Sequence, residues 1–242
     1  MPLCLEILTP PWSFDLEKES LLASGLPDQE LLLTYRDKLN KIYDQFIHSA
    51  TPHPDPFSRA EALFKWLWAG KPFRYKSQGP FRLNEVIDAQ LSKESQFVGN
   101  CLGLTLLYNC LVTKIGTAAE ALYLENAFGK GPHVLTLLRR ATSPIDIENS
   151  LPDGFDYRGH LDDPSRTKWG EQELVADIYH SLGNELFLKG EWAEALEKYE
   201  MSLRLNPGYE KARLNKLILL DKKEMDRRRD ERREKCHSKV RW

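Results

Sequence analysis

The sequence predicts an α+β fold followed by an all-α C-terminal part. Three observations support this fold class: amphipathic helical patterns before residue 100, strand-like segments at 118–124, 133–138 and 144–149, and a helical-hairpin pattern from residue 176. The chain has 242 residues and is 41% hydrophobic, which suffices for one core of about 150 residues and a small appendage. A formal net charge of −2 gives no global indication of a polyanionic partner.

Two amphipathic helices are expected at the N-terminus, over 14–24 and 28–48. The second repeats apolar residues at the helical period and therefore carries one apolar stripe. Because such a stripe packs on a core, residues 1–56 are expected to form an N-terminal helical segment that covers a core of residues 57–165. The stripe consists of Leu31, Leu32, Tyr35, Leu39, Ile42, Tyr43, Phe46 and Ile47.

A cysteine opens the most apolar of the predicted helices, which runs from Cys101 to Thr113. Gly99 and Asn100, just before it, are turn and N-cap residues. Free N–H groups and the positive end of the helix dipole stabilise a thiolate at this position, and a backbone N–H there can donate to an oxyanion. The alternative interpretation of Cys101 is an ordinary buried thiol. Cys110 follows no such turn and points to the other side of the helix, so we interpret it as a core residue.

Strand-like segments follow this helix, and they carry a histidine and two acids. His133 opens the strand 133–138, and a turn then leads into a returning strand. In the resulting hairpin Asp146 and Glu148 share one face, because side chains alternate along a strand. Either carboxylate can bond the imidazole, with Asp146 the first choice and Glu148 the reserve. Cys101, His133 and Asp146 would then be the nucleophile, base and orienting acid of a catalytic triad.

The part of the chain around these residues resembles the transglutaminase-like superfamily of cysteine enzymes. In that family a helix starts with the nucleophilic cysteine, a later strand opens with the histidine, and a neighbouring strand brings an Asp or Asn. The resemblance therefore implies an α+β catalytic domain in which the helix bearing Cys101 packs against an antiparallel sheet. It covers about 57–149 and also rests on three upstream segments: Ala60–Trp68 as a helix, Phe73-Arg74-Tyr75 as an extended segment, and Arg82–Ile87 as a short helix.

Within the superfamily the chain is most similar to a bacterial branch that has a Gly-Asn-Cys-Leu-Gly-Leu run and tetratricopeptide repeats after the catalytic domain. That branch often has Asn-Ile-Glu where this chain has Asp146, Ile147 and Glu148, so Asp146 takes the orienting position by alignment. The second donor to an oxyanion is open between Gln96 and Asn100. We expect neither a cofactor nor a metal, because the sequence holds no CxxC or HExxH spacing.

The C-terminal part has the spacing of one tetratricopeptide repeat, a pair of antiparallel helices of 34 residues. A single repeat cannot bury its apolar face alone, so residues 210–223 are expected to form a capping helix. The other face must then pack on the catalytic domain or on a second chain. Residues 170–223 would thus be the repeat with its cap, a module that binds a protein partner. The pattern comprises Tyr179, Leu182, Gly183, Leu186, Gly190, Trp192, Ala195, Tyr199, Asn206 and Pro207, and the capping helix is expected to bury Leu214, Leu217, Ile218 and Leu220.

Residues 224–242 form a charged C-terminal helix or tail. Acidic residues are interleaved with basic ones at helical spacing, which favours a solvated helix over a nucleic-acid or membrane surface. No segment reaches the ~20 apolar residues of a membrane span, and no signal peptide is indicated. Four cysteines without regular spacing indicate a reducing compartment, so a cytoplasmic location is expected. His48 and His53 have no cysteine nearby and are interpreted as loop residues.

Two functions of different classes remain open. In the first, the chain is a cysteine enzyme that acts on an amide or related acyl group of a protein or peptide, as a protease or amidase with water and as a transglutaminase with an amine. In the second, the same fold and the repeat form a non-catalytic interaction scaffold. The complete set of thiol, imidazole and acid favours the enzyme. The loop 150–169, just after the acid, is either a wall of the active-site cleft or a linker.

Overall fold

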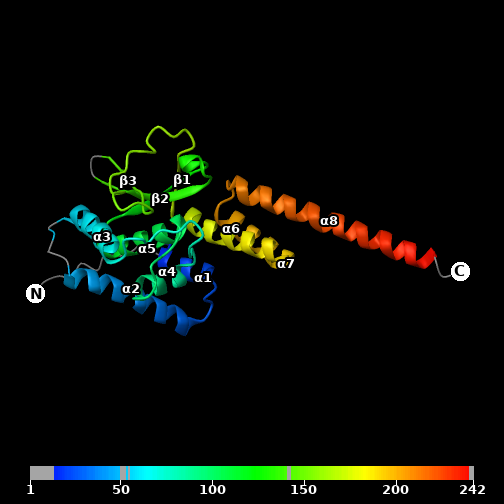
Figure 1. Cartoon of the computed structure of the whole chain (residues 1–242), viewed down its shortest axis with the longest axis horizontal. Coiled ribbons are helices and arrows are strands. Elements are labelled where there is room, and N and C mark those ends of the chain that lie inside the picture. Colours follow the sequence, from blue (N-terminus) through cyan, green and yellow to red (C-terminus); the bar gives the residue numbers. More distant parts are fainter. Residues whose placement is uncertain (1–13, 50–52, 54, 141–142, 240–242) are drawn as a thin grey trace, which may run out of the picture.

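The computed structural model describes residues 14–49, 53, 55–140 and 143–239. Within these ranges, N-terminal helices and a four-stranded antiparallel sheet are followed by three C-terminal helices, which confirms the predicted α+β class with an all-α end (Figure 1). The helices are α1 (Leu16–Ala23), α2 (Gln29–Ser49), α3 (Pro56–Gly70), α4 (Leu83–Leu91), α5 (Cys101–Lys114), α6 (Glu171–Lys189), α7 (Trp192–Leu205) and α8 (Glu210–Lys239), with a short 3-10 turn η1 (Ala127–Gly129). The strands are β1 (Ala119–Leu124), β2 (His133–Leu138), β3 (Ile145–Ile147) and β4 (Thr167–Trp169).

The N-terminal helices lie close to their predicted positions, and α2 contacts α1, α4 and α5. The buried stripe of α2 is narrower than predicted, because Leu31 and Ile47 are exposed. One prediction is wrong in detail: His48 is not in a loop but in the last turn of α2, where its Nδ1 lies 2.7 Å from the carbonyl oxygen of Asp44. The stripe that does reach the core consists of Leu32, Leu39, Ile42 and Phe46.

Helix α5 is the centre of the core. The Asn100 side chain caps its first turn by accepting a hydrogen bond from the Gly103 N–H (3.0 Å), which confirms the predicted N-cap. Its apolar residues run around the whole helix because α5 is covered on more than one side. The sheet lies over one side and α4 lies on another (Figure 1). An all-round apolar helix of this kind is stable only when it is surrounded.

The sheet has the strand order β3-β2-β1-β4, with every pair antiparallel. The β1–β2 register joins Leu124 to His133, so the histidine lies at one end of the sheet. The predicted hairpin of β2 and β3 is present, but β3 ends at Ile147 and leaves Glu148 beyond the strand. The sequence did not predict β4, which adds Trp169 opposite Ala121 at the other edge.

The C-terminal helices α6 and α7 form the expected antiparallel hairpin. A Cβ atom at Gly183 would lie 2.5 Å from Cε1 of Tyr199, so only glycine allows this approach of the two helices. On its other side α6 contacts α1, β1 and β4, and Leu174, Val175 and Ile178 join the main core. The repeat was predicted to pack its other face on the preceding domain or on a second chain. In the structure this face packs on the preceding part of the same chain.

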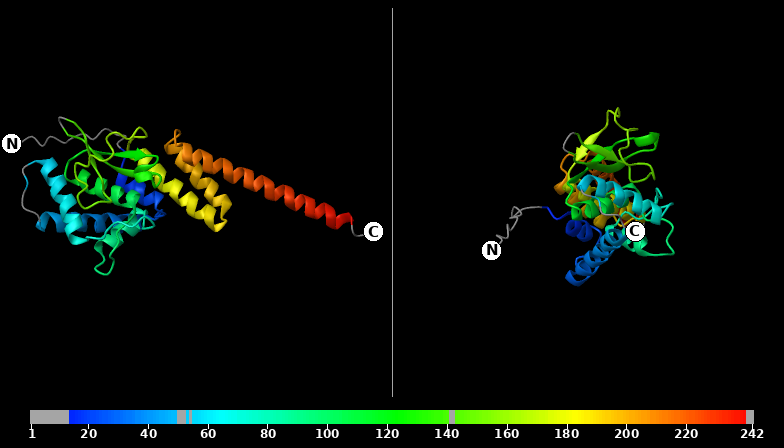
Figure 2. Two further views of the ribbon diagram at one scale, coloured as in Figure 1. Left: turned by 45° about the horizontal axis from the view of Figure 1, so that its top comes forward. Right: turned by 90° about the vertical axis from the view of Figure 1, so that its left-hand side faces the viewer.

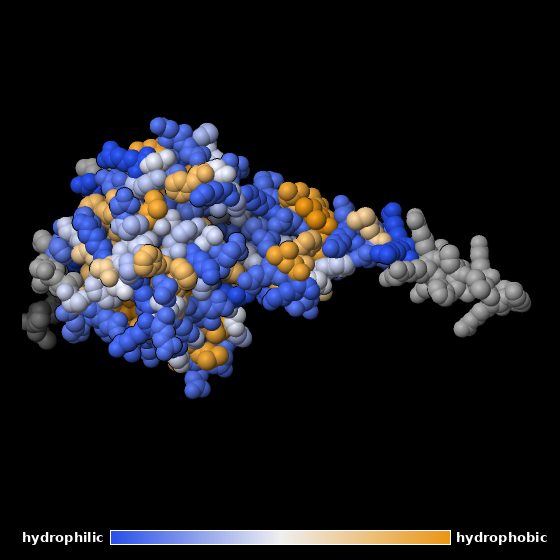
Figure 3. All heavy atoms as spheres, in the orientation of Figure 1, coloured by the Kyte–Doolittle hydropathy of each residue, from blue (hydrophilic) through white to orange (hydrophobic). Residues whose placement is uncertain are grey.

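Helix α8 leaves the body of the molecule as a single long arm (Figures 1 and 2). It packs on α7 through Leu219, which is fully buried together with Tyr199 and Ala195. The prediction of the buried side of this helix is wrong, since the four residues expected inside are between 40% and 57% exposed. Figure 3 shows apolar side chains gathered on the part of the arm nearest the body. The large apolar residues that are exposed on this part of α8 are Leu214, Leu217, Ile218 and Leu220.

None of the described helices has the length and apolar character needed to cross a membrane. The predictions made for residues 1–13 and for the last three residues of the chain lie outside the described residues.

Candidate active site

Cys101 is the first residue of α5 and is partly exposed. The turn before it is held by backbone bonds: the Asn100 N–H donates to the Pro80 carbonyl (2.9 Å), and Gly99 pairs with Tyr75 in an isolated bridge. A Cβ at position 103 would lie 2.6 Å from the Pro80 oxygen, so glycine in the first turn lets this backbone approach. The thiol therefore lies at a tightly held helix N-terminus, as predicted.

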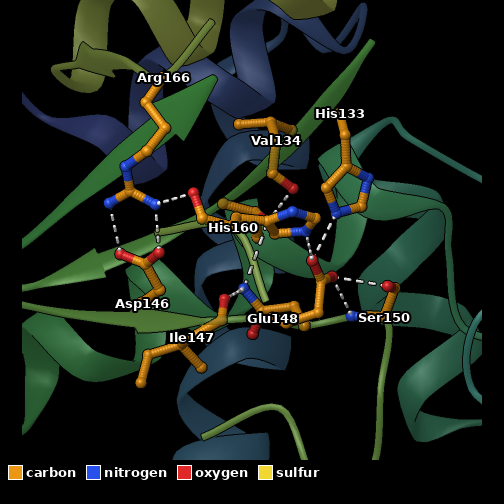
Figure 4. Close-up of polar contacts among 10 residues, drawn as sticks. His133, Val134, Asp146, Ile147, Glu148, Ser150, His160 and Arg166 are labelled. Atoms are coloured by element: carbon orange, nitrogen blue, oxygen red, sulfur yellow. Dashed lines mark hydrogen bonds and ion pairs between the residues drawn. The ribbon is translucent and has the colours of Figure 1, made fainter. Parts of the chain in front are cut away.

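His133 lies between Cys101 and a carboxylate. Its ring is buried, and its Nε2 is 2.7 Å from Oε2 of Glu148 (Figure 4). Burial by itself would lower the pKa of His133, but hydrogen bonds to Cys101 and Glu148 outweigh burial and raise that pKa to about 10. The imidazole is therefore held as an imidazolium between two acidic groups at neutral pH. Such a ring is poised to exchange a proton with a thiol.

Glu148, and not Asp146, bonds the imidazole. The β2–β3 register sets Asp146 opposite Leu137, four residues along the strand from His133, or roughly 13 Å at the rise of a strand. The carboxylate of Asp146 instead accepts two bonds from Arg166 (2.6 and 3.1 Å). The prediction that Asp146 orients the imidazole is therefore wrong, and the alternative, Glu148, is the acid that bonds His133.

The chain brings Glu148 to the histidine by turning immediately after β3. The Glu148 N–H donates to the Gly154 carbonyl (2.8 Å), which closes a tight loop. A Cβ atom at Gly154 would lie 2.0 Å from the Glu148 oxygen, so this loop requires glycine. Simple alternation along a longer strand could not have placed Glu148, because the strand has already ended.

The carboxylate of Glu148 is fully buried and has partners on both oxygens. Oε1 accepts from the N–H (3.0 Å) and the hydroxyl (2.6 Å) of Ser150, while Oε2 faces His133. Burial would raise the pKa of Glu148, but the neighbouring imidazoles of His133 and His160 and the hydrogen bonds from Ser150 lower it to about 2. Glu148 is therefore an anion at neutral pH, and it can hold the imidazolium.

His160 is a site residue that the sequence did not predict. It lies in the loop interpreted as either a wall or a linker, it is 3% exposed, and its Nε2 is 3.4 Å from Oε2 of Glu148 (Figure 4). Its ring packs against Phe128 and Tyr157, with centroids 4.6 and 5.1 Å away. The loop thus forms a wall of the site. The only signal in the sequence was the concentration of aromatic and polar residues just after the acids.

The candidates for an oxyanion donor differ in position. The side-chain oxygen of Asn100 is engaged as the cap of α5, and Gln96 is exposed in the preceding loop. A role for either in binding an oxyanion stays a prediction. Tyr75 is a further neighbour of the site: burial, with the negative charges of Cys101 and Glu148, raises the pKa of its phenol. A phenol that stays protonated is able to donate a hydrogen bond.

Among the described residues one group has the geometry to hold a metal ion. The ligand atoms of His133, Glu148 and His160 lie within 4.8 Å of one another, and all three side chains are buried. Two imidazole nitrogens and a carboxylate oxygen suit zinc or iron. The same atoms are also spaced for the hydrogen bond between His133 and Glu148, so the group fits a proton-transfer site equally well.

The helical hairpin that follows β4 carries the one family assignment. The family model of the tetratricopeptide repeat matches residues 176–209, which span most of α6, all of α7 and the turn that leads into α8. Searches against curated proteins and against solved structures found no match to the chain. The region 176–209 is therefore a tetratricopeptide repeat, a type of module that commonly mediates protein interactions.

Proposed function

We propose that this chain is a transglutaminase-like cysteine enzyme that acts on an amide or related acyl group, with Cys101, His133 and Glu148 as its triad. The observation that carries the proposal is the arrangement around His133, whose imidazole bonds both the thiol at a helix N-terminus and a buried carboxylate. The order of thiol, imidazole and acid along the chain, and the helix packed on antiparallel strands, support the resemblance to that superfamily.

In this mechanism the Cys101 sulfur attacks the carbonyl carbon of the substrate and forms a C–S bond. The resulting oxyanion accepts a hydrogen bond from the backbone N–H at the start of α5. His133 then gives its proton to the leaving amine as the C–N bond breaks, which leaves a thioester on Cys101. Glu148 fixes the ring so that its other nitrogen faces the thiol, and it stabilises the imidazolium.

The thioester is resolved by water or by an amine, with His133 taking the proton from the incoming nucleophile. Water gives hydrolysis, and a primary amine gives acyl transfer. The two outcomes are distinguished by offering a fluorescent primary amine with a glutamine-containing protein. Incorporation of the amine shows transfer, whereas new peptide termini or free acid without incorporation show hydrolysis.

The central test is the rate at which iodoacetamide alkylates Cys101, measured by mass spectrometry of its peptide at pH 6 and pH 10. A model thiol has a pKa near 8.5 and is only slightly ionised at pH 6, so we expect wild-type Cys101 to react at least about tenfold faster there. His133→Ala should lose this advantage at pH 6 and keep the rate at pH 10, where a thiolate forms without help. A wild-type rate at pH 6 no higher than that of the model thiol would refute the triad.

Two matched controls accompany this test. Glu148→Gln removes the charge that holds the imidazolium and should lower the rate at pH 6, whereas Glu94→Gln changes an exposed glutamate outside the site and should not. Cys110 serves as the internal control, because it is buried and its pKa is raised well above the usual value by burial. It should remain unmodified in the folded protein at pH 6.

The repeat supports a second, compatible role in binding a protein. Leu188 at the end of α6 is exposed beside Ile218 of α8, and both residues line a hollow of ≈240 Å³ together with Phe187. Loss of the triad reactivity in the test above would leave this interaction role as the proposed function, that of a non-catalytic scaffold.

A further inference from the structure

The carboxylate of Glu148 faces two imidazoles, although a triad requires only one. Oε2 lies 2.7 Å from Nε2 of His133 and 3.4 Å from Nε2 of His160 (Figure 4). The two rings reach it from different segments, the start of β2 and the loop before β4. The second imidazole therefore needs an explanation that the triad by itself does not supply.

His160 has few alternatives to this carboxylate. Its Nε2 is buried and has no hydrogen-bond partner of good geometry among the described residues. Leaving a buried donor unpaired is costly, so a small movement that brings Nε2–H onto Oε2 is favoured. Such bonds are often long in an empty site and shorten when substrate binds. Phe128 and Tyr157 pack against the ring and restrict its other orientations.

The backbone of His160 is anchored by the acid that the sequence had assigned to the triad. Nη1 of Arg166 donates to the His160 carbonyl (2.9 Å) and to Oδ2 of Asp146 (2.6 Å). Because Asp146 lies on β3, two residues before Glu148, this arginine ties the loop to the strand that leads into the triad acid. The buried Asp146 thus anchors the loop that carries His160 through Arg166, without contacting His133.

We propose that His160 is a positioning residue: its Nε2–H bonds Oε2 of Glu148 and holds the carboxylate in the orientation in which it accepts the bond from His133. The inference rests on the proposed function, because it concerns the same Cys101–His133–Glu148 site. A carboxylate with Ser150 on one oxygen and two imidazoles on the other cannot rotate without breaking bonds. The Arg166–Asp146 pair keeps the His160 loop in place.

Two substitutions separate a positioning role from a packing role. His160→Gln places an amide N–H near the former Nε2 and keeps the donor, while it loses the ring. His160→Phe keeps a ring against Phe128 and Tyr157, while it loses the donor. The measured quantity is the ratio of the Cys101 alkylation rates at pH 6 and pH 10, because only the rate at pH 6 depends on the imidazole.

We expect His160→Phe to lower this ratio about tenfold, the usual effect of losing a hydrogen bond to a buried charge, and His160→Gln to restore most of it. A ratio equal to that of wild type in both variants would overturn the proposal. So would a low ratio in His160→Gln with a normal one in His160→Phe, since that pattern indicates packing. If wild type itself shows no excess rate at pH 6, the proposed function fails before His160 is tested, so the two failures are distinguishable.

Metal ligation is the competing role for the same three side chains. The purified wild-type protein is therefore analysed for bound transition metals, and zinc is added to the metal-free protein in an equilibrium dialysis measurement. The positioning role predicts no stoichiometric metal in the protein as purified and no tight zinc binding that depends on His160. One equivalent of zinc that His160→Phe abolishes, with Cys101→Ser as the thiol-free control that keeps it, would make His160 a ligand and overturn the proposal.

Discussion

Around Glu148 polar groups are buried and paired, whereas along α8 apolar side chains are exposed. The carboxylate has hydrogen bonds on both oxygens, and nearby Asp146 is bonded twice by Arg166. On the arm, Leu214 and Leu217 are 57% and 54% exposed. The carboxylates of Glu148 and Asp146 thus have their hydrogen-bond partners within the chain, whereas the leucines of the arm are not buried by the chain. Buried paired charges constrain the geometry of the site, whereas exposed apolar side chains on an arm are the usual character of a contact surface.

The largest expected effect comes from removing the buried carboxylate. Glu148→Leu leaves the His133 imidazolium and the Ser150 donors without their acceptor, and breaking one side of a buried pair typically costs about 3–5 kcal/mol. Urea unfolding should show a loss of this size. Glu94→Leu, at an exposed position, should change stability by less than about 0.5 kcal/mol. Equal losses in both variants would show that the network around Glu148 contributes nothing special.

The next effect tests the two sides of α8. Leu219 is fully buried against α7, and Leu219→Ala should cost about 2–4 kcal/mol through lost burial and a cavity. Leu217→Ala, on the exposed side of the same helix, should lie within about 0.5 kcal/mol of wild type. Thermal unfolding of both variants makes the comparison. A large loss in Leu217→Ala would mean that the exposed side is covered in solution, for instance by a second copy of the chain.

A smaller effect is expected at the crossing of α6 and α7. Gly183→Ala puts a methyl group 2.5 Å from the Tyr199 ring, and overpacking of this kind costs about 1–3 kcal/mol. Helix propensity alone would favour alanine at this position. The sign of the change in the free energy of unfolding therefore shows whether overpacking or helix propensity dominates. Far-UV circular dichroism during urea unfolding measures it. Increased stability would mean that Tyr199 moves aside freely.

The last comparison concerns pH, because titration removes a charge but leaves the side chains in place. The pKa of Glu148 is depressed to about 2, so its stabilisation is full above the unfolded pKa near 4.3 and is lost as the pH falls toward 2. The pKa of His133 is raised to about 10, so its stabilisation is full below about 6.5 and is lost as the pH rises to 10. Both losses concern the interaction between His133 and Glu148. The free energy of unfolding should therefore be greatest between about pH 4.3 and pH 6.5.

Glu148→Gln tests this window, since the amide keeps a similar shape without the charge. The variant should show a flatter dependence of stability on pH on both sides of the maximum. A variant curve that keeps the wild-type slope between pH 7 and pH 10 would show that the His133–Glu148 pair is not the group that titrates.

Features set by neighbouring residues were predictable, and those set by distant contacts were not. The start of α5 follows from Asn100, whose cap is formed within one turn, and the sequence therefore predicted where Cys101 lies. The choice between Asp146 and Glu148 depends on where β3 ends, which the loop through Gly154 decides. Alternation alone treats the two acids as equivalent.

His160 and α8 show the same limit. Arg166 joins the loop that carries His160 to Asp146 of β3, and no local sequence pattern encodes this contact. In α8, leucines occur on more than one side, and the position of α7 selects Leu219 for burial over Leu217. Helix periodicity predicts that a stripe exists, but a neighbouring helix decides which stripe is used.

The join between the sheet and the repeat has a consequence for how the two parts work together. Only Gly170 separates β4 from α6, and Tyr209, just after the repeat's second helix, packs on Trp169 and Tyr123 of the sheet. No flexible linker therefore separates the sheet from the repeat. If the repeat binds the substrate polypeptide, that polypeptide would reach Cys101 at one fixed distance and in one fixed orientation. Selectivity would then come from the spacing between two features of that polypeptide, and not from local concentration.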